Sequence, residues 1–194
     1  MGKFRFGVML MVGMGLGTGA YADDGGKLSS HRTCPDAVLA AADANFGAGS
    51  GAITECIRVR DDLKIVAAFN SAAVNSANGH GQQVLNARNI YNDYTSNYGM
   101  RIGNDFKVVV VGYAAGARWL LNDAAYTVSY GTGNPSDTIV LDLISKGVKF
   151  YMCQNTMTGQ GWTKDDLLPG VKMVPAGVTA LIDFQNRGFT YINP

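Results

Sequence analysis

The side chains with the clearest capacity for chemistry in this sequence are three cysteines, Cys34, Cys56 and Cys153. An odd number of cysteines leaves at least one thiol unpaired within the chain or bonded to another chain. Cys34 and Cys56 lie near the N-terminus, and in the chain-entropy model a disulfide between them contributes about 3 kcal/mol to stability. We therefore predict that Cys34 and Cys56 are bonded and that Cys153 is the remaining thiol.

Cys153 follows the apolar run Val148–Met152, which is typical of a strand, and precedes Gln154, Asn155 and Thr156. Reactive groups in an open parallel sheet gather at the carboxyl ends of its strands. If a helical turn begins near Asn155, its free backbone N–H groups point at the sulfur and stabilise a thiolate or persulfide anion. The pKa of Cys153 would then lie below about 8.5, the value for a free cysteine. Asn155 and Thr156 would cap the turn or donate hydrogen bonds to the sulfur.

The position of Cys153 is also compatible with a purely structural role, because free cysteine is among the most buried residue types. A third interpretation is an intermolecular disulfide formed through Cys153, which would give a covalent dimer. The residues around this cysteine leave these alternatives open.

The histidines and the glycine motif of the chain are weaker candidates for a functional site than Cys153. His31 lies in a polar leader, and His80 lies in a predicted loop from which it could reach a pocket as a base. No group of cysteines, histidines and acids has the spacing of metal ligands, so neither a metal nor a cofactor is expected. Gly112 and Gly116 follow a predicted strand, and a tight turn with close helix packing explains them without a bound phosphate.

The elements that would position Cys153 alternate along the chain. Five apolar segments are predicted as strands, at 64–69, 107–111, 148–152, 171–174 and 189–192. Helical patterns lie at 82–98, 114–122, 136–146 and 176–187, with a short helical turn at 164–168. Because the strands lack polar alternation and no hairpin signal joins them, they indicate an α/β fold with an open parallel five-stranded sheet covered by helices on both faces.

The N-terminus has the features of a cleavable signal peptide. Lys3 and Arg5 precede the apolar run Phe6–Leu16, and Ala20 and Ala22 form an A-x-A site. Cleavage after Ala22 would deliver a periplasmic or secreted protein to a compartment in which disulfides form. A retained membrane anchor is the alternative, but the run is shorter than the roughly 20 residues of a membrane span. No later segment is long and apolar enough to span a bilayer, so no membrane association is expected after cleavage.

The predicted mature chain has the size of one ordinary domain. The whole chain carries a formal net charge of +1, and removal of Lys3 and Arg5 makes this charge −1. Such a balance gives no electrostatic reason to expect nucleic acid or an anionic membrane as a partner. Hydrophobic residues make up 47% of the chain, which is ample material for a core.

Three strings in the last third of the chain are distinctive: GVKFYMCQNTM at Gly147–Met157, DLLPGV at Asp166–Val171 and PAGV at Pro175–Val178. They resemble the C-terminal half of DsrE/DsrF-like proteins, and the run of strand, Cys, any residue, Asn, Thr and Met is the most specific part. The predicted organisation is a signal peptide at 1–22, an N-terminal extension with the disulfide at 23–62, and a DsrE-like domain at 63–194.

This resemblance implies a three-layer α/β/α sandwich that assembles into homo-oligomers such as trimers or hexamers. Better-known members of the family carry sulfane sulfur as a persulfide on a cysteine. Cys153 is the one cysteine in the family-like region, so the resemblance implies this role for Cys153, with Asn155 and Thr156 as supporting groups and a sulfur-donor or acceptor protein as partner.

The sequence is therefore compatible with two functions. The first is a periplasmic sulfur carrier or sulfurtransferase that acts through Cys153. The second is a non-catalytic oligomeric binding or accessory module in which Cys153 is structural. Several relay proteins of this family work in the cytoplasm, whereas this chain is predicted to be exported, and family membership alone does not confer an activity.

Overall fold

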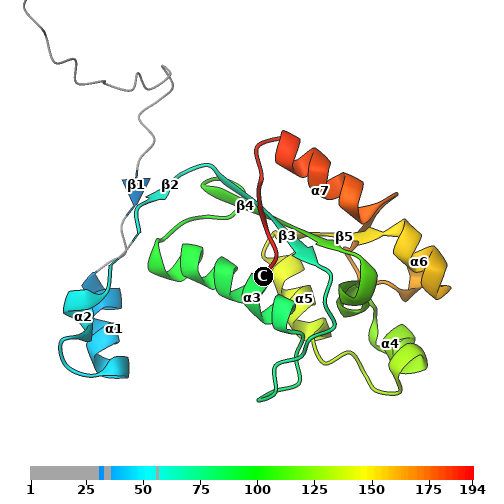
Figure 1. The fold of residues 1–194 in the computed structure, drawn as a ribbon, viewed down its shortest axis with the longest axis horizontal. Helices are drawn as coiled ribbons and strands as arrows, with labels where there is room; N and C mark the ends of the chain where they lie inside the picture. The colour runs from blue at the N-terminus through cyan, green and yellow to red at the C-terminus, as the bar shows by residue number, and fades with distance from the viewer. Residues whose placement is uncertain (1–30, 33–35, 56) are drawn as a thin grey trace, which may run out of the picture.

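The computed structural model describes residues 31–32, 36–55 and 57–194. A five-stranded parallel sheet with helices on both faces forms the larger part of these residues (Figure 1). The predicted signal peptide at 1–22 lies outside the described residues, and so do Cys34 and Cys56. Cleavage after Ala22 and the Cys34–Cys56 disulfide therefore stay predictions.

The strands of the sheet match the five apolar segments of the sequence to within one residue at each end. They are β3 (Leu63–Phe69), β4 (Phe106–Gly112), β5 (Lys149–Cys153), β6 (Lys172–Val174) and β7 (Thr190–Ile192). The strand order is β6-β5-β4-β3-β7, and every neighbouring pair is parallel. The predicted open parallel five-stranded sheet is thus confirmed.

Helices connect these strands. They are α3 (Gln82–Asn92), the π-helix η1 (Asp93–Asn97), the 3-10 helix η2 (Ala114–Leu120), α4 (Asp123–Tyr130), α5 (Asp137–Ser145), α6 (Gln154–Gln160), the 3-10 turn η3 (Lys164–Asp166) and α7 (Gly177–Asn186). The strands from β3 to β6 are laid down side by side in chain order, and β7 returns to the opposite edge. Because parallel crossovers are right-handed, the helix of this return connection, α7, lies on the other face of the sheet.

Side chains of the central strands alternate between two buried clusters. Ala67 and Val110 belong to the larger cluster, which α3, η2, α4 and α5 cover. Val66 and Val109 belong to the smaller cluster, which packs against Leu181 of α7. Both faces of these strands are therefore buried, which explains why their sequences are continuously apolar and confirms the three-layer α/β/α sandwich.

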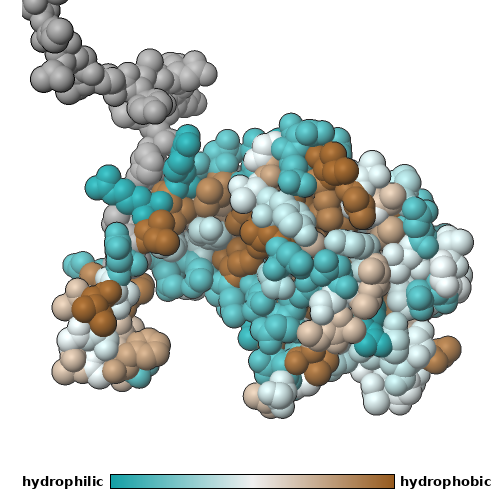
Figure 2. All heavy atoms as spheres, in the orientation of Figure 1, coloured by the Kyte–Doolittle hydropathy of each residue, from teal (hydrophilic) through white to brown (hydrophobic). Residues whose placement is uncertain are grey.

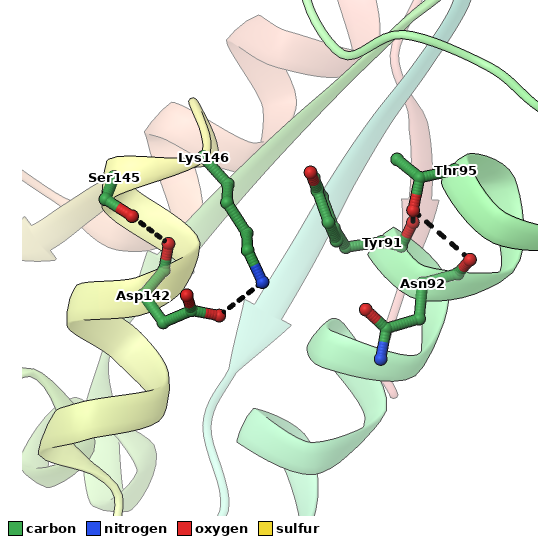
Figure 3. A network of polar contacts seen from close by, with 6 residues as sticks. All are labelled: Tyr91, Asn92, Thr95, Asp142, Ser145 and Lys146. Atoms are coloured by element: carbon green, nitrogen blue, oxygen red, sulfur yellow. Dashed lines mark hydrogen bonds and ion pairs between the residues drawn. The ribbon is translucent and has the colours of Figure 1, made fainter.

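The helices α3 and α5 lie side by side on the larger-core face, and Figure 3 shows the polar contacts at their surface. Lys146, which follows α5, forms an exposed ion pair with Asp142 at 2.7 Å, and its ammonium group lies 5.3 Å from the centroid of the Tyr91 ring on α3. Exposed contacts of this kind contribute about 1 kcal/mol or less. The packing of these helices therefore rests on their buried side chains, such as Leu85 and Leu143.

Three segments differ from the sequence-based expectation. Helix α4 was not expected; the Asn122 side chain accepts a hydrogen bond of 2.8 Å from the Ala125 N–H to begin it, and Gly131 ends it in the left-handed conformation. A second short helix, α2 (Ser50–Ile53), forms in a segment for which no helix was predicted. His31 and Arg32, predicted to lie in a flexible leader, form β1 (His31–Arg32).

The N-terminal extension has its own local structure. α1 (Asp36–Phe46) packs against α2, and β1 pairs with β2 (Val59–Arg60) in an antiparallel ribbon. Figure 1 shows the α1–α2 pair at one end of the molecule, apart from the sheet. Among the described residues, no helix has both the length and the apolar character needed to cross a bilayer.

Candidate functional site

Cys153 is the last residue of β5 and the N-cap residue of α6, so its sulfur lies at the carboxyl edge of the sheet. Its side chain is 5% exposed. On one side Cys153 pairs with Val174 of β6, and on the other side Tyr113 follows the end of β4. The position predicted for Cys153 from the apolar run before it is therefore correct, as is the helix that begins after it.

Four donors act on the Cys153 sulfur. Burial alone raises the pKa of this thiol, but weak hydrogen bonds from the Thr156 hydroxyl and from the backbone N–H groups of Thr156, Gly177 and Asn155 outweigh it. The pKa of Cys153 consequently lies below its ordinary value of 9.0. Cys153 makes none of the short side-chain hydrogen bonds of an ordinary N-cap, so these donors act on the sulfur mainly through electrostatic attraction. Such an arrangement favours an anionic sulfur.

Thr156 is held in place from a different strand. The backbone N–H of Ala114, just after β4, donates a hydrogen bond of 3.1 Å to Thr156 Oγ1. Ala114 has a φ of 48°, a left-handed conformation that costs a residue with a Cβ about 1 kcal/mol. Because the hydroxyl oxygen already accepts from Ala114, its own proton is free to point at the sulfur.

Gly177 brings a second helix to Cys153. It is the first residue of α7 and lies in the PAGV string of the sequence. A methyl group added at Gly177 would lie 2.8 Å from Cβ of Tyr113 and 3.3 Å from Cβ of Cys153, so only glycine permits this approach. The amino ends of α6 and α7 therefore converge on one sulfur, and both helix dipoles favour its negative charge.

Asn155 contributes through its backbone. Its N–H lies beside the sulfur and also donates to the Pro175 carbonyl oxygen at 3.3 Å, while its side chain is exposed. The structure thus brings together Cys153, Asn155 and Thr156 as the sequence suggested, and adds Gly177 and Ala114. The signal for Gly177 was present in the PAGV string, but its approach to Cys153 depends on the path of the chain through β6.

A polar network occupies the carboxyl edge beside Cys153. Gln83, which is 4% exposed, donates to the Ala68 carbonyl oxygen at 2.9 Å and accepts from the backbone N–H groups of Asn70 and Ser71. The Asn70 side chain in turn donates to the Tyr113 hydroxyl at 3.1 Å. These bonds hold the ends of β3 and β4, and with them the residues that surround the sulfur.

The other residues singled out from the sequence lie in structural positions. His80 hydrogen-bonds to the Pro135 carbonyl oxygen through Nδ1. A methyl group at Gly116 would lie 2.3 Å from the backbone carbon of Phe69, and one at Gly112 would lie 2.6 Å from the Leu120 side chain, so close packing explains both glycines. Within the described ranges, no three cysteine, histidine or acidic residues are grouped so that they could hold a metal ion.

The chain belongs to the DsrE/DsrF-like family, because the model of that family matches residues 24–194. This match includes the segment 24–62 as well as the region that carries the three distinctive strings. No curated protein matches the chain.

Solved structures are similar to this chain. One is MTH1491, a protein of unknown function from Methanobacterium thermoautotrophicum, at 27% identity and a TM-score of 0.52, covering 69% of this chain and 100% of its own. Another is the YchN protein from E. coli, at 15% identity and a TM-score of 0.47, covering 68% of this chain and 97% of its own.

Proposed function

We propose that this protein is an exported sulfur carrier that binds sulfane sulfur as a persulfide on Cys153 and transfers it to an acceptor thiol. The observation that supports this most strongly is the set of donors around the sulfur, from Thr156, Gly177 and Asn155. Donors of this kind stabilise an anionic sulfur, which is the nucleophile in sulfur exchange. Family membership is consistent with the same role.

The proposed reaction needs no oxidant. The Cys153 thiolate attacks the outer sulfur of a donor persulfide, R–S–SH. A new S–S bond forms to Cys153 while the donor S–S bond breaks, and R–S⁻ leaves with the electron pair. In the second step an acceptor thiolate attacks the outer sulfur of the Cys153 persulfide, and the Cys153 thiolate is regenerated. The Thr156 hydroxyl would donate to the sulfur that carries the charge in each resting state.

The proposal places the protein in the periplasm or outside the cell, on the basis of the A-x-A site that ends at Ala22. It also includes a homo-oligomer such as a trimer or hexamer. Exposed apolar side chains gather over α7 (Figure 2), where Val178 and Ile182 are 58% and 53% exposed, and Met173 of the edge strand β6 is 42% exposed. A surface of this kind is typical of a protein–protein contact.

A second candidate function rests on the burial of Cys153. A side chain that is 5% exposed offers little surface to a donor, as expected for a non-catalytic oligomeric module in which the cysteine only packs. The same burial disfavours an intermolecular disulfide. The lowered pKa favours the sulfur carrier, since a purely structural thiol has no need of donors around it.

Intact-mass spectrometry separates the two functions. Mature non-reduced protein is incubated with inorganic polysulfide, and the mass is compared for wild type, Cys153→Ser and Cys153→Ala. A sulfur carrier gains one sulfur atom on Cys153 in the wild type and none there in either variant, and it loses this sulfur to added thiol. Equal loading of the three proteins, or no loading of the wild type, would contradict the proposal.

A further inference from the structure

A cavity of about 380 Å³ has Ala114 in its wall, the residue whose backbone N–H donates a hydrogen bond to Thr156. Its walls come from segments that follow three different strands: Ala72 after β3, Ala114 and Arg118 after β4, and Gln160 after β5. It therefore lies at the carboxyl edge of the sheet, where ligands bind in open α/β folds. Figure 1 shows α4 and α6, which flank it, at the same end of the molecule.

The cavity is connected to the sulfur through one residue. Ala114 lines the cavity and donates to Thr156 Oγ1 at 3.1 Å, and Thr156 is one of the donors that lower the pKa of Cys153. Gln160 lies at the other end of α6, and a rise of about 1.5 Å per residue puts it on the order of 10 Å further along. A ligand that occupies the cavity and also reaches the sulfur must therefore be an elongated molecule.

Arg118 gives the cavity its charge. Its guanidinium carbon lies 3.6 Å from the centroid of the Tyr130 ring, which also lines the cavity. The Nε atom of Arg118 is buried without a hydrogen-bond partner, and no carboxylate of the described residues lies within ion-pair distance of this guanidinium. The Arg118 residue as a whole is partly exposed, and the planar donors of a guanidinium match a carboxylate in two parallel hydrogen bonds.

The size and walls of the cavity define the rest of the ligand. A volume of about 380 Å³ is far larger than the roughly 30 Å³ that one water molecule occupies, so it accommodates an organic group rather than a single small ion. Tyr130 and Trp162 supply aromatic surface for an apolar or amide stem. The cavity wall includes no acidic residue that would repel an anion.

We infer that this cavity is a binding subsite for the carboxylate of an organic persulfide donor, with Arg118 as the residue that recognises the carboxylate. This inference rests on the proposed function of Cys153 for the identity of the ligand as a sulfur donor. A peptide-sized thiol that bears a carboxylate spans the separation from Cys153 to the Arg118 cavity, whereas inorganic polysulfide carries no carboxylate for Arg118 to bind.

The subsite is tested with S-methylglutathione, a carboxylate-bearing thioether that cannot react with Cys153. Binding to the mature protein is followed by calorimetry and by the fluorescence of Trp162, with Trp162→Phe, in which only Trp119 remains, as the control for the origin of the signal. Arg118→Gln is expected to weaken binding by at least about tenfold, because a charge-assisted pair of hydrogen bonds is lost. Gln160→Glu keeps Arg118 and adds a negative charge to the exposed cavity wall, and it should also weaken binding by several fold.

Gln185→Glu is the matched control, because it makes the same substitution at an exposed position of α7 outside the cavity, and it should leave binding unchanged. The dimethyl ester of S-methylglutathione should bind at least about tenfold more weakly than the free acid. Absence of saturable binding would overturn the inference, and so would equal affinity for the acid and the ester or equal affinity in wild type and in both cavity variants.

Loading with two donors distinguishes this inference from the proposed function. Glutathione persulfide should load wild-type Cys153 at least about tenfold faster than Arg118→Gln, while inorganic polysulfide loads both proteins at the same rate. If polysulfide loads Cys153 and S-methylglutathione does not bind, the subsite is wrong and the carrier function stands. If S-methylglutathione binds as expected and no donor loads Cys153, the subsite stands and the carrier function is wrong.

Discussion

The Ala114 backbone N–H donates a hydrogen bond of 3.1 Å to Thr156 Oγ1, and this bond joins the end of β4 to the helix that follows Cys153. The Thr156 oxygen accepts this bond, so its own proton is free for the Cys153 sulfur, whose pKa this hydroxyl lowers. Two strands thus contribute to the site: β5 carries Cys153, and the turn after β4 positions the Thr156 hydroxyl, which lowers the pKa of Cys153.

Thr156→Val removes the hydroxyl while keeping the shape of the side chain. The pKa of Cys153 should rise, because the Thr156 hydroxyl, one of the donors that favour the thiolate, is lost. The midpoint of the pH dependence of Cys153 alkylation measures this shift. Thr158→Val, at an exposed position of the same helix, is the control and should not change the midpoint. An unchanged midpoint in Thr156→Val would contradict the role of the hydroxyl.

Gly177→Ala tests the approach of α7 to the sulfur. The added methyl group would lie 2.8 Å from Cβ of Tyr113, so the first turn of α7 must move away and its N–H leaves Cys153. Alkylation should then need a higher pH than in the wild type, and the free energy of unfolding should fall by about 1–3 kcal/mol. Both changes are measured on one sample, by alkylation and by urea unfolding.

Gly159→Ala is the matched control for the Gly177 variant. Outside the backbone of its own helix and its chain neighbours, no atom lies within 4 Å of the methyl group that it adds. Alanine in a helix is more stable than glycine by about 0.5–1 kcal/mol, so this variant should be slightly stabilised and its alkylation midpoint unchanged. If both variants shifted the midpoint equally, the specific contact of Gly177 with the sulfur would be excluded.

The lowered pKa of Cys153 makes stability depend on pH. The folded state favours the thiolate, so between the folded-state pKa and the ordinary value of 9.0 the unfolded chain binds more protons, and the free energy of unfolding rises with pH. This contribution is complete above 9.0 and is lost as the pH falls through the folded-state pKa. The free energy of unfolding is measured with urea at each pH for wild type and for Cys153→Ser. The difference between the two proteins isolates the contribution of Cys153, because the other titrating groups are the same in both. A difference that stays constant from about pH 6 to about pH 10 would contradict the lowered pKa.

Gly116→Ala tests why η2 lies where it does. The new methyl group would lie 2.3 Å from the backbone carbon of Phe69, which cannot move without displacing β3. We expect a loss of about 2–4 kcal/mol in the free energy of unfolding, because backbone must shift within a packed core. Ala115→Ser, at the exposed neighbouring position, should change stability by about 0.5 kcal/mol or less. A Gly116→Ala protein as stable as the wild type would disprove the proposed packing role.

The sheet was predictable from the sequence because strands such as Leu63–Phe69 and Phe106–Gly112 are apolar on both faces, which only a covered parallel sheet requires. Helix α4 was not predictable from the sequence, because its start depends on the side chain of Asn122 rather than on a strong apolar period. The position of Cys153 at a strand end and the helix after it were both apparent from the order of residues.

The rest of the site depends on contacts between distant segments, which a local pattern does not contain. Gly177 reaches Cys153 only because β6 pairs in parallel with β5 and carries the start of α7 back to the same edge. Arg118 has no motif around it, and its importance comes from the cavity and from the ring of Tyr130. Such residues follow from the packed fold, not from spacing along the chain.

The most direct test of the central claim is the rate at which Cys153 of the native, non-reduced mature protein is alkylated as a function of pH. Peptide mass spectrometry assigns the reaction to Cys153 rather than to Cys34 or Cys56. We predict a reactive thiol with a midpoint below that of the same cysteine in the urea-unfolded protein, as the donors from Thr156, Gly177 and Asn155 require. A Cys153 that reacts only after unfolding, or with a midpoint equal to or above that of the unfolded protein, would show that the thiol is structural and would contradict the account.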